Sequence, residues 1–460
     1  MFLLATSAQA QLTSAGPAVS PPPAAGTMPV RWPDVAFDPD AGVWLGVSGA
    51  DNVQGQWFTA AGAVEGAAFT VDADAFFAQC PRVAFGGGAF FVTWHASISM
   101  SATRVRGRLL RHGPPALTQD FDVSPDGTNW EMGAAVAAGS GEFLVAWQSS
   151  ATKIQAQRVG PTGAKLGAVI DVDSAAPYAR DPAVAYDPVT DTFVVAYAGC
   201  VGNDDCFVRA QRVKGGTGAR VGTSLTLDEG ITAGYVPEVA YDAANRRWLA
   251  VWYRATPGAR SLEARTIAPD GTLGTRRTAS AMYASYDANS VAWSPVSGTF
   301  VVVTHATDQD VAVELDAEGA PLNAPGLLWG PTGSTGNFNP RIAANGRAPD
   351  FFGVTSTMFA SLSGQRLTTG TRLLAMLPDA GPDAGTVSDA GVDAGATVDA
   401  GVRPQPDAGT MTVPTMPGAS CGCSSGPGAC LLLVLALLRR ASGAGTRESS
   451  GTGGVCSRRA

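Results

Sequence analysis

Three histidines, His95, His112 and His305, are the first candidates for acid–base or metal chemistry in this chain. His95 and His305 each follow an apolar run, so we expect them at corresponding ends of two separate strands. His112 lies between charged and small residues, where we expect it to be solvated. Zinc sites need cysteine and histidine ligands at short, characteristic spacings, and the chain contains no such spacing. We therefore predict no metal site and assign no catalytic residue.

Aspartates could supply hard oxygen ligands for calcium. Asp204 and Asp205 are adjacent, and other aspartates begin turns such as Asp38-Pro39-Asp40-Ala41-Gly42. None has the dense spacing of a dedicated calcium loop. An aspartate that begins a turn usually accepts hydrogen bonds from nearby backbone N–H groups. We therefore predict no cofactor, with a structural calcium ion as the minor alternative.

Cys200 and Cys206 flank the short polar segment Val-Gly-Asn-Asp-Asp, which a disulfide could close. The alternative is a pair of reduced thiols in a loop. We predict the disulfide, because both ends of the chain carry patterns typical of export.

Ten tryptophans raise the question of stacking against a carbohydrate. Trp94, Trp147 and Trp252 end apolar runs, where packing explains them. Others fall in less regular positions and are our candidates for a ligand-binding face: Trp57, Trp130 and Trp329.

A sequence repeat must position all these side chains. It occurs seven times, with a period of 48 to 55 residues. Such a period is typical of propellers and repeat arrays. Each repeat begins with a short strand, usually led by proline, and a turn follows it. These first strands are Pro33–Phe37, Pro81–Phe85, Ala134–Ala138, Pro182–Tyr186, Pro237–Tyr241, Asn289–Trp293 and Pro340–Ala344.

The second strand of each repeat is almost wholly apolar, as in Phe143-Leu144-Val145-Ala146-Trp147. A strand of this kind is covered on both faces, which happens when sheets pack radially as blades. The third strands alternate, and the fourth are shorter and more polar, as outer edges should be. We predict an all-β fold: a seven-bladed β-propeller of four-stranded antiparallel blades over residues 28–377. A β-solenoid is the structural alternative.

The closure of the ring stays open at this point. Thr371–Leu377 could complete the last blade, or residues 14–20 could return to pair with it. Before the propeller, Ala8-Gln9-Ala10 fits the cleavage pattern of a secretory signal. We interpret residues 1–11 as the remnant of a signal peptide shortened by a misplaced start codon, and 12–27 as a Pro/Ala-rich leader.

After the propeller, residues 378–419 repeat Asp-Ala-Gly and proline, so we predict a disordered, acidic linker. Ser420-Cys421-Gly422-Cys423-Ser424-Ser425 then precedes an apolar run, Ala429–Leu438, and two arginines. This order resembles the C-terminal sorting tail of myxobacterial surface proteins (the MYXO-CTERM type) over residues 420–440. The resemblance implies membrane anchoring or export, with processing or lipidation at Cys423 or Cys421. Residues 441–460 are expected to be a disordered tail.

The net charge of −8, with few lysines, argues against nucleic-acid binding, which needs a basic surface. We expect an exported monomer at the cell surface, associated with the outer membrane through its tail or released outside the cell. Its predicted role is a binding or scaffold module for an extracellular protein or polysaccharide. The alternative is a secreted carbohydrate-active hydrolase or lyase that uses loop carboxylates on one face.

Overall fold

The computed structural model describes 16 segments of the chain, which carry all of the strands named in the next paragraphs. They are residues 12–20, 31–49, 52–72, 78–99, 102–113, 118–125, 131–149, 153–173, 178–201, 206–231, 233–281, 289–306, 309–323, 326–329, 337–357 and 362–369. Within them, no helix is long and apolar enough to cross a bilayer. The predicted linker, sorting tail and C-terminal tail lie outside the described residues, as do Thr371–Leu377.

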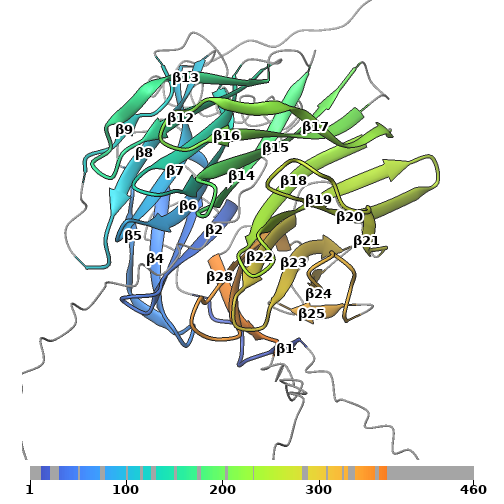
Figure 1. The fold of residues 1–460 in the computed structure, drawn as a ribbon. Helices are drawn as coiled ribbons and strands as arrows, with labels where there is room; N and C mark the ends of the chain where they lie inside the picture. Colours follow the sequence, from blue (N-terminus) through green and yellow to red (C-terminus); the bar gives the residue numbers. More distant parts are fainter. Residues whose placement is uncertain are drawn as a thin grey trace, which may run out of the picture.

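Seven antiparallel sheets of four strands form the fold, which confirms the predicted all-β propeller (Figure 1). Blades 1 to 3 contain β2 (Arg31–Asp38), β3 (Val43–Gly49), β4 (Val53–Thr59) and β5 (Val64–Thr70); β6 (Ala78–Gly86), β7 (Ala89–Ser99), β8 (Ala102–Leu110) and β9 (Phe121–Asp122); β10 (Glu131–Ala138), β11 (Phe143–Ser149), β12 (Lys153–Val159) and β13 (Lys165–Asp173).

Blades 4 to 7 follow the same order along the chain. They contain β14 (Ala179–Asp187), β15 (Thr192–Cys200), β16 (Cys206–Lys214) and β17 (Arg220–Ile231); β18 (Ala233–Asp242), β19 (Arg247–Thr256), β20 (Ala259–Ile267) and β21 (Arg277–Ser280); β22 (Asn289–Ser294), β23 (Thr299–Ala306), β24 (Gln309–Leu315) and β25 (Leu327–Trp329); β26 (Asn337–Ala344), β27 (Asp350–Thr357) and β28 (Leu362–Thr368), with β1 (Thr13–Ser14) as the fourth strand of blade 7.

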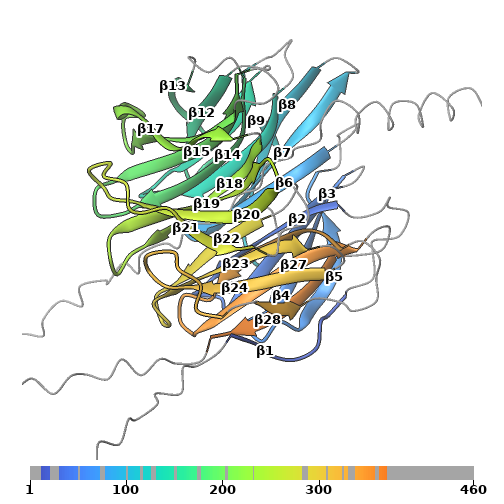
Figure 2. The same cartoon turned by 90° about the vertical axis from the view of Figure 1, so that its right-hand side faces the viewer.

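The first strands of neighbouring blades lie side by side around the middle of the molecule, and the fourth strands lie at its outside (Figures 1 and 2). Strand β26 of blade 7 contacts β2 of blade 1, so the ring is closed. The structure therefore excludes an open β-solenoid.

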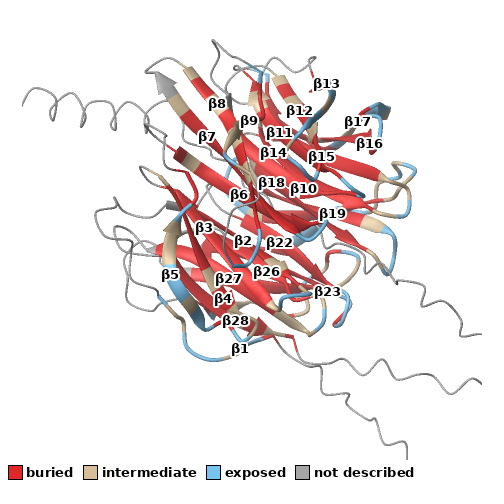
Figure 3. Ribbon diagram, turned by 90° about the vertical axis from the view of Figure 1, so that its left-hand side faces the viewer, coloured by how far each residue is buried: buried red, intermediate tan, exposed pale blue. Residues whose placement is uncertain are grey.

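Apolar packing between blades forms the core. Seven clusters of buried residues occur in the described chain, and each combines two neighbouring blades. The second strands lie at the centre of these interfaces; all nine residues of β15 are buried (Figure 3). Their apolar sequences follow from this position, because each is covered by a blade on both faces.

The N-terminal segment closes the ring. Thr13 pairs with Thr368 and Val19 bridges to Gly364, both on β28. Leu12 is only 1% exposed and belongs to the cluster between blades 6 and 7. The closure is thus the second of the two alternatives, and the predicted leader 12–27 must be corrected, because its first part is a strand of the propeller.

A repeated side-chain contact supports the outer strands. In blades 1, 3 and 4 a third-strand glutamine donates to backbone oxygens beside the bulge of the fourth strand; these are Gln56, Gln157 and Gln211. In blade 7 the corresponding residue, Gln365, donates to the carbonyl of Gly16 at 3.0 Å. The N-terminal segment therefore reproduces the contact that a fourth strand makes elsewhere.

Replacing Leu12 by alanine should destabilise the whole propeller, because it would leave a cavity in the core between blades 6 and 7. We expect a loss of about 3 kcal/mol in the free energy of unfolding, measured by chemical denaturation. Thr13→Ala is the matched control: Thr13 is exposed, and its loss should cost under about 0.5 kcal/mol. Equal effects of the two substitutions would contradict a closing role for this segment.

Candidate functional site

The first strands share a backbone distortion near their beginnings. Five non-glycine residues have a left-handed φ of 49° to 56°, each directly before a proline, and each lies where the pairing with the second strand shifts register. They are Trp32, Cys80, Asp181, Val236 and Asn339. A bulge is one of the few places where proline fits within a sheet. The proline that marks each of these five repeats in the sequence is thus part of a bulge.

Charged side chains follow the proline in four blades, and all four are fully buried: Asp34, Arg82, Glu238 and Arg341. Arg341 of blade 7 donates to Glu238 Oε1 of blade 5 at 3.0 Å. Since blade 6 separates these two blades, the side chains meet at the centre of the ring. Asp34 Oδ2 accepts the N–H of Val83 in the next blade at 2.9 Å. We call these four residues the central charge cluster.

Burial dominates the protonation of this cluster. It raises the pKa of Asp34 to about 6, although Arg82 and Arg341 favour the carboxylate. Burial also lowers the pKa of Arg82 to about 9; Arg341 lowers it further, while Asp34 and Glu238 oppose the shift. Arg82 and Arg341 thus act on the pKa of Asp34, and Arg341, Asp34 and Glu238 act on the pKa of Arg82. Two arginines and two carboxyl groups can balance one another there.

The sequence carries a signal for this cluster, although the candidate residues predicted from it did not include these four. When the repeats are aligned, the residue after the proline is Ala183 in blade 4. In blades 1, 2, 5 and 7 the same position holds one of the four charged cluster residues. A charge in the middle of an otherwise apolar strand is rarely buried without a partner. Two positive and two negative residues at one repeat position therefore indicate mutual pairing.

The two strand-end histidines have separate surroundings. His95 is 4% exposed, and burial lowers its pKa to about 4, with a further contribution from Arg82. His305 Nδ1 lies 3.0 Å from Asp310 Oδ1. Burial raises the pKa of Asp310, while the hydrogen bonds from His305 and Thr355 oppose the shift. No group of three potential metal ligands occurs among the described residues.

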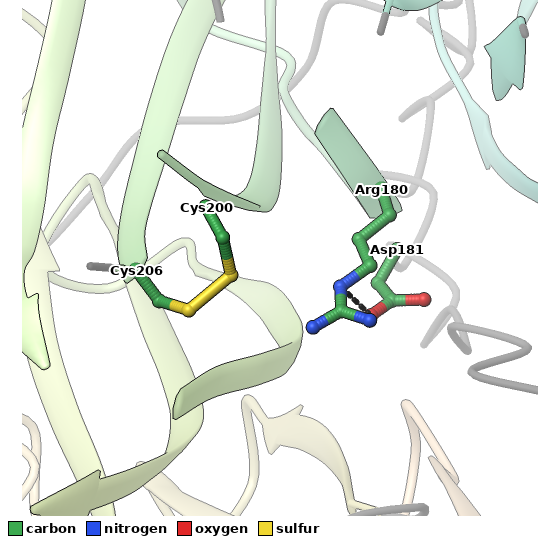
Figure 4. The surroundings of a disulfide bond; sticks show 4 residues. All are labelled: Arg180, Asp181, Cys200 and Cys206. Atoms are coloured by element: carbon green, nitrogen blue, oxygen red, sulfur yellow. Dashed lines mark ion pairs between the residues drawn. A yellow bond between two sulfur atoms is a disulfide. The ribbon is translucent and has the colours of Figure 1, made fainter. Parts of the chain in front are cut away.

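First strands begin and second strands end at the same face of the propeller, which we call the mouth face. Cys200 and Cys206, the predicted pair, form a disulfide there between directly opposed residues of β15 and β16 (Figure 4). Arg180 and Asp181 lie on the neighbouring strand β14, with Arg180 Nε 3.7 Å from Asp181 Oδ2 (Figure 4). The disulfide therefore fixes strand ends at the mouth face.

A stack of flat side chains lies beside this disulfide, and we call it the mouth stack: Tyr178, Arg180, Tyr235 and Tyr253. The guanidinium carbon of Arg180 is 3.9 Å from the ring centre of Tyr235 and 5.8 Å from that of Tyr178. Tyr235 in turn stacks on Tyr253, with ring centres 6.2 Å apart. Arg180 and Tyr235 occupy equivalent positions, one residue before the left-handed residue of blades 4 and 5. Their proximity follows from the packing of adjacent blades, which no local sequence pattern reveals.

Two of the three candidate tryptophans, Trp57 and Trp329, lie in the described residues. Trp57 is half-buried, and its ring contacts Phe69, Phe90 and His112 at centre-to-centre distances of 5.2 to 5.6 Å. Trp329 is only 2% exposed and packs against Gly353 of blade 7, so it must be removed from the candidate ligand face. Trp130 lies outside the described residues.

The side chains of the turn aspartates accept hydrogen bonds from backbone N–H groups. Asp38 Oδ1 accepts the N–H groups of Asp40 and Ala41, and Asp242 Oδ1 accepts those of Ala244 and Asn245, at 2.8 to 3.0 Å. These contacts match the turn role predicted for such aspartates. Asp204 and Asp205 lie outside the described residues.

No protein-family model matches this chain, and no curated protein matches it. Solved structures with a similar course of the chain include an α-L-arabinanase from Cellvibrio cellulosa, with 10% identity over 54% of this chain and 95% of that chain and a TM-score of 0.36. A sialidase from Trypanosoma rangeli has 8% identity over 66% of this chain and 56% of that chain, with a TM-score of 0.45. A puromycin-hydrolyzing peptidase from Mycobacterium tuberculosis has 12% identity over 80% of this chain and 57% of that chain, also with a TM-score of 0.45. Similarities this distant carry no inference about activity.

Removing one member of the central charge cluster should destabilise the protein strongly. Arg341→Ala leaves Glu238 buried without this partner, and we expect a loss of about 3–5 kcal/mol in the free energy of unfolding. Arg347→Ala is the matched control in the same blade, because Arg347 pairs with Asp40 at the exposed surface, where a pair contributes under about 1 kcal/mol. Chemical denaturation measures both. Recovery of stability in the double variant Arg341→Met, Glu238→Gln would support mutual neutralisation, and comparable losses for Arg341→Ala and Arg347→Ala would contradict it.

The lowered pKa of His95 predicts a pH dependence of stability. The folded state keeps His95 neutral until the pH falls to about 4, while the unfolded chain binds the proton below about 6.5. Stability from this group is therefore present above pH 6.5 and is lost as the pH falls towards 4, by about 3 kcal/mol. Asp34 acts in the opposite direction, because its raised pKa costs stability as the pH rises from 3.8 through about 6.

The comparison of wild type with His95→Gln at each pH isolates the histidine, since Asp34 contributes to both proteins. We expect the wild type to lose stability relative to the variant as the pH falls from about 7 to about 4, in denaturation curves recorded across this range. A difference that does not change with pH would show that His95 gains its proton without penalty.

Proposed function

We propose that this chain is an exported propeller that binds an extracellular ligand at its mouth face. The observation that carries the proposal is the mouth stack, an arginine layered between tyrosines beside a disulfide. Tyrosine and arginine supply large contact areas together with hydrogen-bonding groups, and they are enriched where proteins bind partners. A site on strand ends is also positioned more firmly than a site on loops alone.

The Cys200–Cys206 disulfide supports export, because disulfides persist in oxidising compartments and are rare in the cytosol. The signal-like Ala8-Gln9-Ala10 and the resemblance of residues 420–440 to a myxobacterial sorting tail agree with this location. In the proposed mature protein, the acidic linker holds the propeller away from the membrane. Cys423 or Cys421 would be the residue that is processed or lipidated.

The burial of the central carboxyl groups gives no support to the alternative, a carbohydrate-active hydrolase or lyase, whose carboxylates would have to come from loops on one face. Glycoside hydrolysis uses two carboxyl groups that reach the scissile bond. Asp34 and Glu238 have no exposed surface, and Glu238 is engaged by Arg341. Among the described residues at the centre of the ring, these two groups pair with protein atoms instead of facing a substrate.

The proposed location predicts the mass of the protein isolated from a myxobacterial host. We expect a mature form that ends near Cys423, carries a lipid-sized mass increment and is digested by protease added to intact cells. Cys423→Ser and Cys421→Ser, made singly, should identify the modified residue, since only the substitution at that residue should remove the increment. An unprocessed form that keeps Leu431–Leu438 and resists external protease would contradict surface sorting.

A further inference from the structure

We infer that the ligand of the mouth face is a neutral carbohydrate chain that stacks on Tyr178 and hydrogen-bonds to Arg180. This inference rests on the proposed binding function and names the chemical class of its ligand. An aromatic ring offers a negative face, against which the C–H groups on one side of a sugar ring can pack. The neighbouring guanidinium offers N–H donors to the sugar hydroxyls.

The side chains of the mouth stack differ in exposure, from the accessible Tyr178 to the buried Tyr253, and this suits such a ligand. Tyr178 is 39% exposed, Arg180 is half-buried, and Tyr253 at the far end is 1% exposed. The buried end supports the exposed end, because each flat group lies against the next. A ligand that packs on Tyr178 would therefore extend an existing stack and would need little rearrangement of Arg180.

The disulfide-bearing strand holds Tyr178 in place. The N–H of Cys200 donates to the carbonyl of Tyr178 at 3.1 Å, just outside the regular pairing of β14 with β15. The approach is close enough that a Cβ on Gly199 would collide with the same carbonyl oxygen. Preorganisation of this kind lowers the entropy lost on binding. The disulfide thus fixes the backbone of the exposed tyrosine at the mouth face.

A carbohydrate fits this surface better than a protein partner does. Stable protein interfaces bury about 800 Å² on each side around an apolar centre. Of the described residues, six large hydrophobic side chains are exposed, and they are distributed over blades 1, 4 and 6: Val64, Tyr178, Val189, Val201, Val296 and Leu328. Val201, which follows the disulfide-bearing strand, is the member of this set nearest to Tyr178 along the sheet. A narrow aromatic site with hydrogen-bond donors therefore matches a sugar chain.

The charges around the stack favour a neutral chain over an acidic one. Arg180 has Asp181 at 3.7 Å, and Arg209, which lies over Phe207 near the same strand ends, has Asp173 at 3.9 Å. Among the described residues beside the disulfide, each of these two arginines is thus accompanied by a carboxylate. A polymer of uronic acids would gain no net attraction there and would meet a protein of net charge −8.

Affinity electrophoresis tests the inference on the folded, disulfide-bonded full chain. Galactomannan and xylan serve as neutral probes and alginate as the uronic-acid probe. We expect at least one neutral probe to retard the wild type, Tyr178→Ala to weaken that binding at least tenfold, and Tyr178→Phe to retain most of it because the ring remains. Leu328→Ala is the control, since Leu328 is 53% exposed in blade 6 and outside the stack, and its binding should not change.

Thermal denaturation of each variant verifies that Tyr178→Ala remains folded. Binding of a neutral probe that survives Tyr178→Ala would overturn the inference and leave the proposed binding function standing, with its site elsewhere. Retardation by alginate alone would overturn the neutral class. If no probe retards the wild type, cross-linking to extracellular proteins decides what remains: a cross-link lost in Tyr178→Ala would replace the carbohydrate by a protein ligand, and no cross-link would also remove the proposed function.

Discussion

Packing between neighbouring blades holds this protein together. Every apolar cluster in the described chain is shared by two blades, so each blade obtains its core from its neighbours. A ring meets this requirement only when the last blade covers the first. The short strand β1 completes blade 7, the blade that covers blade 1, and Leu12 beside it packs in the interface with blade 6. The two ends of the propeller are thereby held in one sheet.

The convergence of first strands around the axis places a second demand on the sequence. In five blades the first strand bulges before a proline, and the residue after that proline is buried. Blade 4 uses the small residue Ala183 at this position, while four other blades use charged residues that neutralise one another. Burying ions costs several kcal/mol each even when they are paired. Removing one partner alone is therefore what costs most, because it leaves a buried charge without compensation.

The mouth face depends both on the packing between neighbouring blades and on the convergence of their first strands. Equivalent positions on blades 4 and 5 carry Arg180 and Tyr235, and the spacing of adjacent blades sets the distance between them. The disulfide at the end of β15 fixes the neighbouring Tyr178 through a backbone hydrogen bond. Function in propellers resides in such local sites and not in the fold itself. The mouth stack, whose outer member Tyr178 is exposed, is such a local site.

Local patterns in the sequence were enough to predict the blade count, the strand order and the pairing of Cys200 with Cys206, because these depend on periodicity and short separations. They also placed Trp94 and Trp147 in the core, since their runs are apolar throughout. The folded ring was needed to show that Leu12 belongs to blade 7, that Trp329 is buried, and that Arg341 meets Glu238. These contacts join residues that lie far apart in the chain and in different blades. The repeat alignment shows that four charges share one position, but which side chains meet is decided only once the ring has closed.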